Sequence, residues 1–210
     1  MKHQNAWIGL IGILLALLLW LAFFWEPART SDIDPRTPHT PLPVAEIPTG
    51  GDFTLQSPSG AVALADFRGK VVLLYFGYTF CPDVCPTSLA ALAQALSALA
   101  PGELEKVQGL FISVDPERDT MDVLKIYVPY FHPGITGLSG TPEQLAQVAR
   151  LYGARYMKQK PDADGLYSVD HSAFTYLIAT DGTLVDSLPH GTSPEQIVDK
   201  IRTQLKAKTP

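Results

Sequence analysis

A continuous apolar segment leads directly into the only two cysteines of the chain. Residues 70–76, KVVLLYF, are apolar after the first position, a pattern typical of a buried central strand. The next stretch, GYTFCPDVCPTS (77–88), contains both cysteines. Beyond it, leucines recur every three or four positions on one predicted helix face: Leu89, Leu92, Leu96 and Leu99. The sequence predicts a strand, a turn that carries two thiols and a helix whose first residue is Pro86.

An isolated pair of thiols has four interpretations: a structural disulfide, a redox dithiol, a peroxidase cysteine with its resolving partner, or a site for a soft metal. A chain of 210 residues, 46% of them hydrophobic, can bury a core without a disulfide, and small disulfide-dependent domains usually have several bridges. We place Cys85 at the helix N-cap and Cys81 in the preceding turn. Unpaired N–H groups there stabilise anions, so we expect both thiols to favour the thiolate form.

The rest of the folded region predicts alternating strands and helices that end in a hairpin and a helix. The predicted elements are a hairpin arm at 53–62 with SPSG as its turn, a strand at 107–114, helices at 120–130 and 141–152, hairpin strands at 174–179 and 183–187, and a helix at 193–206. This order is that of a thioredoxin-like α/β fold with a mixed sheet. Folds of this class place their sites where a strand gives way to a helix.

The N-terminal segment 6–25, AWIGLIGILLALLLWLAFFW, contains no charged residue. As a helix it would span about 30 Å, the thickness of the hydrocarbon core of a bilayer. A cleaved signal peptide is the alternative, but the exit Phe-Phe-Trp is a poor cleavage site. We predict a short cytoplasmic tail at 1–5, one transmembrane helix at 6–25, a proline-rich tether at 26–49 and a folded domain at 50–210.

Charge and leader composition indicate the compartment. The net charge is -5 and there is no run of Lys or Arg, which argues against nucleic acid as a partner. An Arg-rich, acid-poor presequence is absent, so we do not expect a mitochondrial transit peptide. We expect a protein of the bacterial inner membrane with its domain in the periplasm, although Lys2 on one side and Arg29 and Arg36 on the other do not fix the orientation by charge count.

Three motifs, YFGYTFCPDVCPTSL (75–89), SVDPERDT (113–120) and VDHSAFTYLIATDG (169–182), occur in the order and spacing of a known family. From about residue 50 to its end the chain resembles the Sco/SenC family, the membrane-tethered copper chaperones of cytochrome c oxidase assembly. The resemblance implies that Cys81, Cys85 and His171 are copper ligands, two thiolates and an imidazole that suit Cu(I) and can also hold Cu(II). It further implies delivery to the copper-binding subunit of cytochrome c oxidase, which has a dinuclear copper site. We include another periplasmic copper donor among the expected partners.

Other residues near these motifs have lesser predicted roles. Asp83 and Asp170 are candidates to orient the ligands from outside the first coordination sphere. Asp115 to Asp119 belong to the family signature without a ligand role, and we expect them to shape the loop beside the site or to face the partner. We interpret the remaining histidines and nearby methionines as ordinary structural or surface residues: His39, His132, His190, Met121 and Met157.

Two redox functions compete with the copper interpretation. A thiol-disulfide oxidoreductase usually has C-x-x-C and a cis-proline before the hairpin strand, whereas this chain has C-x-x-x-C and no proline between Pro161 and Pro189. A peroxiredoxin would need the pattern P-x-x-x-T-x-x-C, which is not met. We therefore expect a metallochaperone and not a general enzyme. The alternative that stays open is a reductase whose dithiol, Cys81 and Cys85, forms a reversible disulfide and reduces the cysteines of the copper target.

Overall fold

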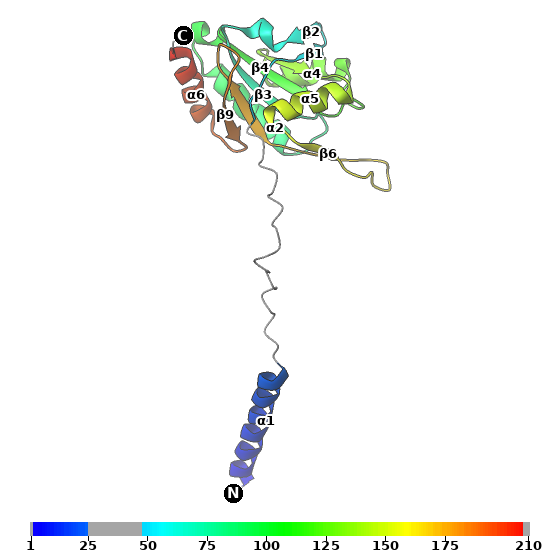
Figure 1. The fold of residues 1–210 in the computed structure, drawn as a ribbon, viewed down its shortest axis with the longest axis vertical. Helices are drawn as coiled ribbons and strands as arrows, with labels where there is room; N and C mark the ends of the chain where they lie inside the picture. Colours follow the sequence, from blue (N-terminus) through cyan, green and yellow to red (C-terminus); the bar gives the residue numbers. More distant parts are fainter. Residues whose placement is uncertain (1, 25–47, 208–210) are drawn as a thin grey trace, which may run out of the picture. The chain divides into compact units, whose positions relative to one another are not determined.

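The computed structural model describes residues 2–24 and 48–207, with side chains of the first segment described from Ile13 onward (Figure 1). The chain divides into two compact units, Met1–Ala45 and Glu46–Pro210. The first contains helix α1 (Lys2–Phe24). Among the helices that the structure describes, none combines the length and the apolar character needed to cross a membrane. The predicted transmembrane helix is therefore not confirmed, and the predicted tether at 26–49 lies outside the described residues except for its last two.

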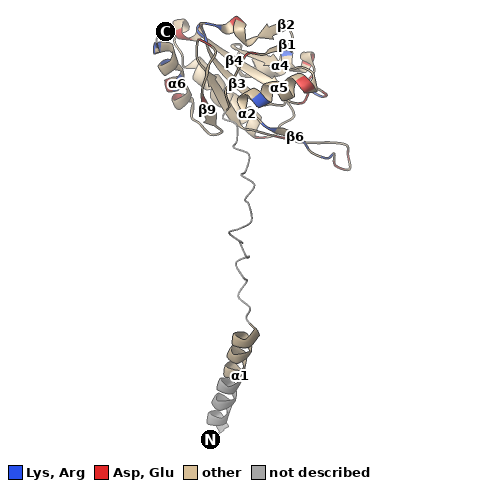
Figure 2. Cartoon of the chain, in the orientation of Figure 1, with Lys and Arg blue, Asp and Glu red and all other residues tan. Residues whose placement is uncertain are grey.

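The second unit is built on a five-stranded mixed sheet. Its strand order is β5 (Ile135–Leu138), β4 (Val107–Ser113), β3 (Val71–Gly77), β8 (Phe174–Ile178) and β9 (Leu184–Pro189). Strand β4 runs parallel to both β3 and β5, whereas β8 is antiparallel to β3 and β9. The two central strands β3 and β4 carry no charged side chain (Figure 2), and every residue of β3 is buried. The predicted α/β fold with a mixed sheet is confirmed.

Helices cover both faces of this sheet. Successive side chains of a strand point to opposite faces. Tyr75 therefore faces one layer, in which α2 (Val84–Ser97) packs against α4 (Met121–Phe131) and α6 (Pro194–Lys206). Phe76 faces the other layer, where its ring contacts Tyr152 of α5 (Pro142–Tyr152). Aromatic and aliphatic side chains on both sides of β3 thus form the core.

The helix-end signals in the sequence agree with the structure. The Thr141 hydroxyl accepts a hydrogen bond from the Gln144 amide, and Gly153 ends α5 in the left-handed conformation with φ of 65°. Ser193 caps α6 in the same way. The predicted hairpin arm is also present, as β1 (Thr54–Ser57) paired with β2 (Gly60–Ala63).

The start of α2 differs from the prediction. The helix begins at Val84, not Pro86, and its first backbone hydrogen bond runs from the Thr87 amide to the Asp83 carbonyl at 3.2 Å. Pro86 is therefore the third helical residue, where no N–H partner is required. Cys85 lies inside the first turn and is not the N-cap.

Several short elements were not predicted. They are η1 (Leu64–Phe67), α3 (Pro101–Leu104), strand β5 and a separate two-stranded sheet of β6 (Tyr156–Lys158) and β7 (Val169–His171). The connection between β6 and β7 projects away from the main sheet (Figure 1).

Candidate metal centre

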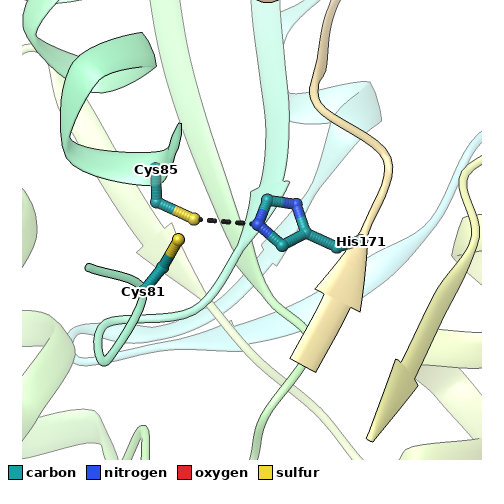
Figure 3. Close-up of side chains that lie close together, drawn as sticks. All are labelled: Cys81, Cys85 and His171. Atoms are coloured by element: carbon teal, nitrogen blue, oxygen red, sulfur yellow. Dashed lines mark hydrogen bonds between the residues drawn. The ribbon is translucent and has the colours of Figure 1, made fainter. Parts of the chain in front are cut away.

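The structure brings Cys81, Cys85 and His171 together at the end of β3 (Figure 3). Cys81 lies in the turn between β3 and α2, Cys85 is the second residue of α2, and His171 is the last residue of β7. The two sulfur atoms and a ring nitrogen all lie within 4.8 Å of one another. Three donors from two distant parts of the sequence therefore converge on a space that one metal ion could occupy.

The orientation of the His171 ring is defined at both of its nitrogens. Nδ1 lies 3.2 Å from the carbonyl oxygen of Ser172, which can only accept a hydrogen bond, so Nδ1 carries the proton. Nε2 then has its lone pair directed at Cys85 Sγ, 3.1 Å away, and accepts from that thiol. Tyr75 and Tyr78 flank the ring edge-on, with ring centroids at 6.1 and 5.8 Å. The imidazole thus presents an unprotonated nitrogen to the two sulfurs, as a metal ligand must.

Burial controls protonation at this site. Cys85 is completely buried, and this burial raises the pKa of its thiol well above the ordinary value. The expectation that this thiol favours the thiolate form is therefore wrong for the metal-free protein, because loss of solvation outweighs the helix N-terminus. Burial also lowers the pKa of His171, which keeps its imidazole neutral. A cation that binds here must displace the thiol protons, as is general for thiolate sites.

Gly77 makes room for the dithiol. A Cβ atom at this position would lie 2.8 Å from Cys85 Sγ and 2.9 Å from a ring carbon of Phe111. Both distances are shorter than carbon atoms tolerate, so the sulfur could not keep its place beside a larger residue.

The segment 115–119 holds the approach to Cys81. The Asp119 carboxylate accepts hydrogen bonds from the Thr79 amide at 2.9 Å, the Thr79 hydroxyl at 2.6 Å and the Ser113 hydroxyl at 2.6 Å. Asp115 accepts from the Tyr167 hydroxyl at 2.8 Å and forms an ion pair with Arg118. These contacts show that the signature shapes the loop beside the site.

The two aspartates predicted to orient the ligands lie at the edge of the Cys81, Cys85 and His171 cluster. Asp83 is the exposed N-cap residue of α2, and its side chain makes no capping hydrogen bond. Asp170 is exposed and accepts from the Gln159 side-chain amide. Its charge raises the pKa of His171 and so opposes the effect of burial. Their predicted roles stay predictions.

His132, His190 and Met157 lie outside the cluster, whereas His39 falls outside the described residues. His132 Nδ1 accepts from the Gly134 amide in a turn, and His190 Nδ1 lies 2.9 Å from the Ser88 hydroxyl. Met157 is exposed on β6.

Sequence reasoning missed the contribution of Arg118 and Tyr167. The Arg118 guanidinium lies 3.6 Å from the Tyr167 ring centroid and 4.8 Å from that of Phe80. Arg118 is part of the SVDPERDT motif and could have been singled out from it. Tyr167 stands outside the three motifs, and no pattern in the sequence indicates its contacts.

Comparisons with known proteins agree with this arrangement. The SCO1/SenC family model matches residues 44–206. The mitochondrial SCO2 homolog of Bos taurus is 48% identical over 160 residues, which cover 75% of this chain and 60% of that relative. The chain thus spans less than two thirds of the length of this relative.

Solved structures show the same fold. Bradyrhizobium japonicum ScoI with copper bound is 41% identical with a TM-score of 0.68, and the match covers 74% of this chain and 99% of that one. Yeast Sco1 with copper bound is 36% identical with a TM-score of 0.70, covering 77% and 90% respectively. From the family match together with these relatives, we conclude that the chain belongs to the SCO1/SenC family.

Proposed function

We propose that this protein is a copper chaperone that binds one copper ion through Cys81, Cys85 and His171. The observation that carries the proposal is the convergence of three donor atoms within 4.8 Å. Two thiolates form the soft donor pair that Cu(I) prefers, and the imidazole makes the set compatible with Cu(II) as well. Two similar solved structures are of copper-bound proteins, which supports the same metal for this chain.

The donor set suits transfer of the metal as well as binding. Three protein ligands leave room for an incoming ligand from a recipient, so the ion can pass between proteins without being free in solution. Cys85 is completely buried, whereas His171 is partly exposed and Cys81 lies at the limit of burial. A recipient would therefore meet Cys81 and His171 first.

We further propose the dinuclear copper site of cytochrome c oxidase as the recipient during assembly of that enzyme. The family to which the chain belongs and the sequence motifs that identify it support this recipient. An uncharged segment at 6–25 supports attachment to the bacterial inner membrane, with the domain in the periplasm. Extraction of the full-length chain from isolated membranes by detergent but not by carbonate would support the attachment; release by carbonate would contradict it.

A Cu(I) titration of the reduced full-length chain against a chromophoric chelator tests the copper site. We expect one Cu(I) per chain, loss of this binding in Cys81→Ser and in Cys85→Ser, and a weaker complex in His171→Ala. His132→Ala is the matched control, because His132 lies in a turn away from the cluster, and it should bind like the wild type. Unchanged affinity in His171→Ala would remove the histidine from the site.

The second candidate function is reduction of the recipient's cysteines. Both cysteines are free thiols within 4.8 Å of one another, so they can donate two electrons to a target disulfide and become a disulfide themselves. The target gains two thiols and the two protons come from this pair. We expect slow reduction of insulin and faster reduction of an oxidised dinuclear-copper domain. Insulin turnover comparable to that of a C-x-x-C thioredoxin, without retained copper, would favour a general oxidoreductase.

A further inference from the structure

We propose that Asp115, Arg118 and Tyr167 form a clamp that positions His171 and so determines whether the imidazole can serve as the third copper donor. The inference rests on the proposed copper site. It assigns a positioning role to three residues that do not themselves contact the metal donors.

His171 needs such a constraint because its strand is not part of the main sheet. Among the described strands β7 pairs only with β6, and each has three residues. Within these two strands Val169 is the single buried residue. The Ser172 amide donates to the Arg155 carbonyl and the Arg155 amide donates to the Ser172 hydroxyl, which closes the hairpin beside His171. A short two-stranded hairpin is marginally stable by itself, so strand pairing within it would not fix the ring without contacts to the rest of the domain, such as those of Tyr75 and Tyr78.

Tyr167, four residues before His171, ties this hairpin to the loop after β4. Its hydroxyl donates to Asp115 Oδ1 at 2.8 Å, and its carbonyl oxygen accepts from Arg118 Nη1 at 2.8 Å. Its ring lies against the Arg118 guanidinium, 3.6 Å from centroid to carbon. Arg118 Nε donates to Asp115 Oδ2 at 2.5 Å, so the carboxylate of Asp115 contacts both Arg118 and Tyr167. Tyr167 is thus held through its backbone carbonyl, its ring and its hydroxyl.

The same guanidinium contacts the segment that carries Cys81. It lies 4.8 Å from the ring centroid of Phe80 and 5.5 Å from that of Tyr78. Its remaining nitrogen, Nη2, is buried and has no hydrogen-bond partner among the described residues. Arg118 is therefore packed between aromatic rings that come from the dithiol side and from the histidine side. The position of Arg118 thus sets how far the imidazole of His171 lies from the two thiols.

Burial makes these contacts effective. The side chain of Asp115 is 3% exposed and that of Arg118 is 19% exposed, so solvent screens their ion pair far less than a pair on the surface. Arg is suited to this place because its planar group can stack on a ring and donate several hydrogen bonds at once. A lysine would keep the charge but lose the stacking and the second hydrogen bond.

The test uses the reduced full-length chain and Cu(I), with Tyr167→Phe and Arg118→Lys as the variants. Tyr167→Phe removes only the hydroxyl that contacts Asp115. Loss of a residue that orients a metal ligand typically lowers metal affinity about 10- to 100-fold, and we expect both variants to fall in this range. The second readout is the ¹⁵N chemical shift of His171 Nε2, which should change on Cu(I) binding in the wild type and change less in the variants. A merely structural role would not move this signal.

Two matched variants serve as controls. Tyr130→Phe removes the hydroxyl of a residue on α4 that is 86% exposed, and Arg202→Lys alters an ion pair with Glu103. Both should bind Cu(I) within about twofold of the wild type, the range expected of surface changes.

The possible outcomes separate this inference from the proposed function. If the wild-type Nε2 signal responds to Cu(I) and both variants respond equally with unchanged affinity, the clamp has no positioning role. If the wild type itself shows no Nε2 response, His171 is not a ligand and both proposals fall. If Arg118→Lys does not fold, as circular dichroism would show, Tyr167→Phe alone decides.

Discussion

The two halves of the donor set are held in different ways. The dithiol arm, residues 71–97 from β3 through α2, lies in the core: all of β3 is buried, as are Cys85, Leu89 and Leu92. The imidazole arm, residues 156–171, is a hairpin outside the main sheet whose turn, 160–166, is exposed. Apolar packing fixes the thiols, whereas the imidazole is held by its contacts to Ser172, Tyr75 and Tyr78 and by a few polar contacts around Tyr167.

This difference suits a protein that binds a metal and then gives it up. Two donors in a rigid core keep their spacing when a partner approaches. A third donor on a marginal hairpin can move away when its contacts to Asp115 and Arg118 are disturbed, because opening there exposes little apolar surface. Under the proposed function, the dithiol retains copper while the histidine can yield its place to a ligand of the recipient.

The strongest test of the comparison is a pair of leucine substitutions, one in each arm. Leu89→Ala should lower the free energy of unfolding by about 2–5 kcal/mol, because Leu89 is fully buried in α2 and its loss leaves a cavity. Leu166→Ala, in the imidazole arm, removes a side chain that is 66% exposed. It should change the free energy of unfolding by less than about 0.5 kcal/mol. Urea unfolding measures both. Equal effects would mean that the two arms do not differ as described.

Two glycine substitutions, one inside the dithiol arm and one outside it, test how tightly that arm is packed. Gly77→Ala places a Cβ 2.8 Å from Cys85 Sγ and should cost about 1–3 kcal/mol of stability through overpacking. It should also weaken Cu(I) binding, because the sulfur must move. Gly102→Ala is the control, since a Cβ there meets no atom within 4 Å. Wild-type stability and Cu(I) affinity in Gly77→Ala would show that the dithiol tolerates displacement.

The dithiol arm was largely predictable from the sequence. An uninterrupted apolar run identifies a buried strand, and the leucine spacing identifies the helix face that packs on it. The start of α2 was misplaced by two residues because Pro86 fits any position of the first turn. The high pKa of Cys85 could not be read from the sequence, since it depends on how completely the fold removes water from the sulfur.

In the imidazole arm, the sequence predicted only the proposed ligand and not the strands that carry it. The DHS motif identified His171, but β6 and β7 are three residues each and too short to show a strand pattern. Their position depends on contacts of Tyr167 with residues about 50 positions earlier in the chain. Strand β5 was missed for a similar reason, because its four residues are recognised as a strand only through parallel pairing with β4.

Substitution of Asp119 should have the smallest effect on stability. It tests how the loop at 115–119 holds the dithiol arm through Thr79. Burial raises the pKa of its carboxyl above the ordinary 3.8, against hydrogen bonds from Ser113 and Thr79 that favour the charged form. The negative charge of Asp115 acts in the same direction as burial. The charge of Asp119 in turn contributes to the raised pKa of Tyr127, which is mainly due to burial.

A raised pKa in the folded state means that the folded protein binds the proton more tightly than the unfolded chain does. The stability contributed by Asp119 is then fully present below pH 3.8 and is lost as the pH rises through the higher folded-state value. The stability difference between wild type and Asp119→Asn should therefore shift in favour of the variant as the pH increases. Urea unfolding at a series of pH values measures this difference. A shift in favour of the wild type would mean that the hydrogen bonds from Ser113 and Thr79 outweigh burial, so that the loop holds the dithiol arm through a charged group.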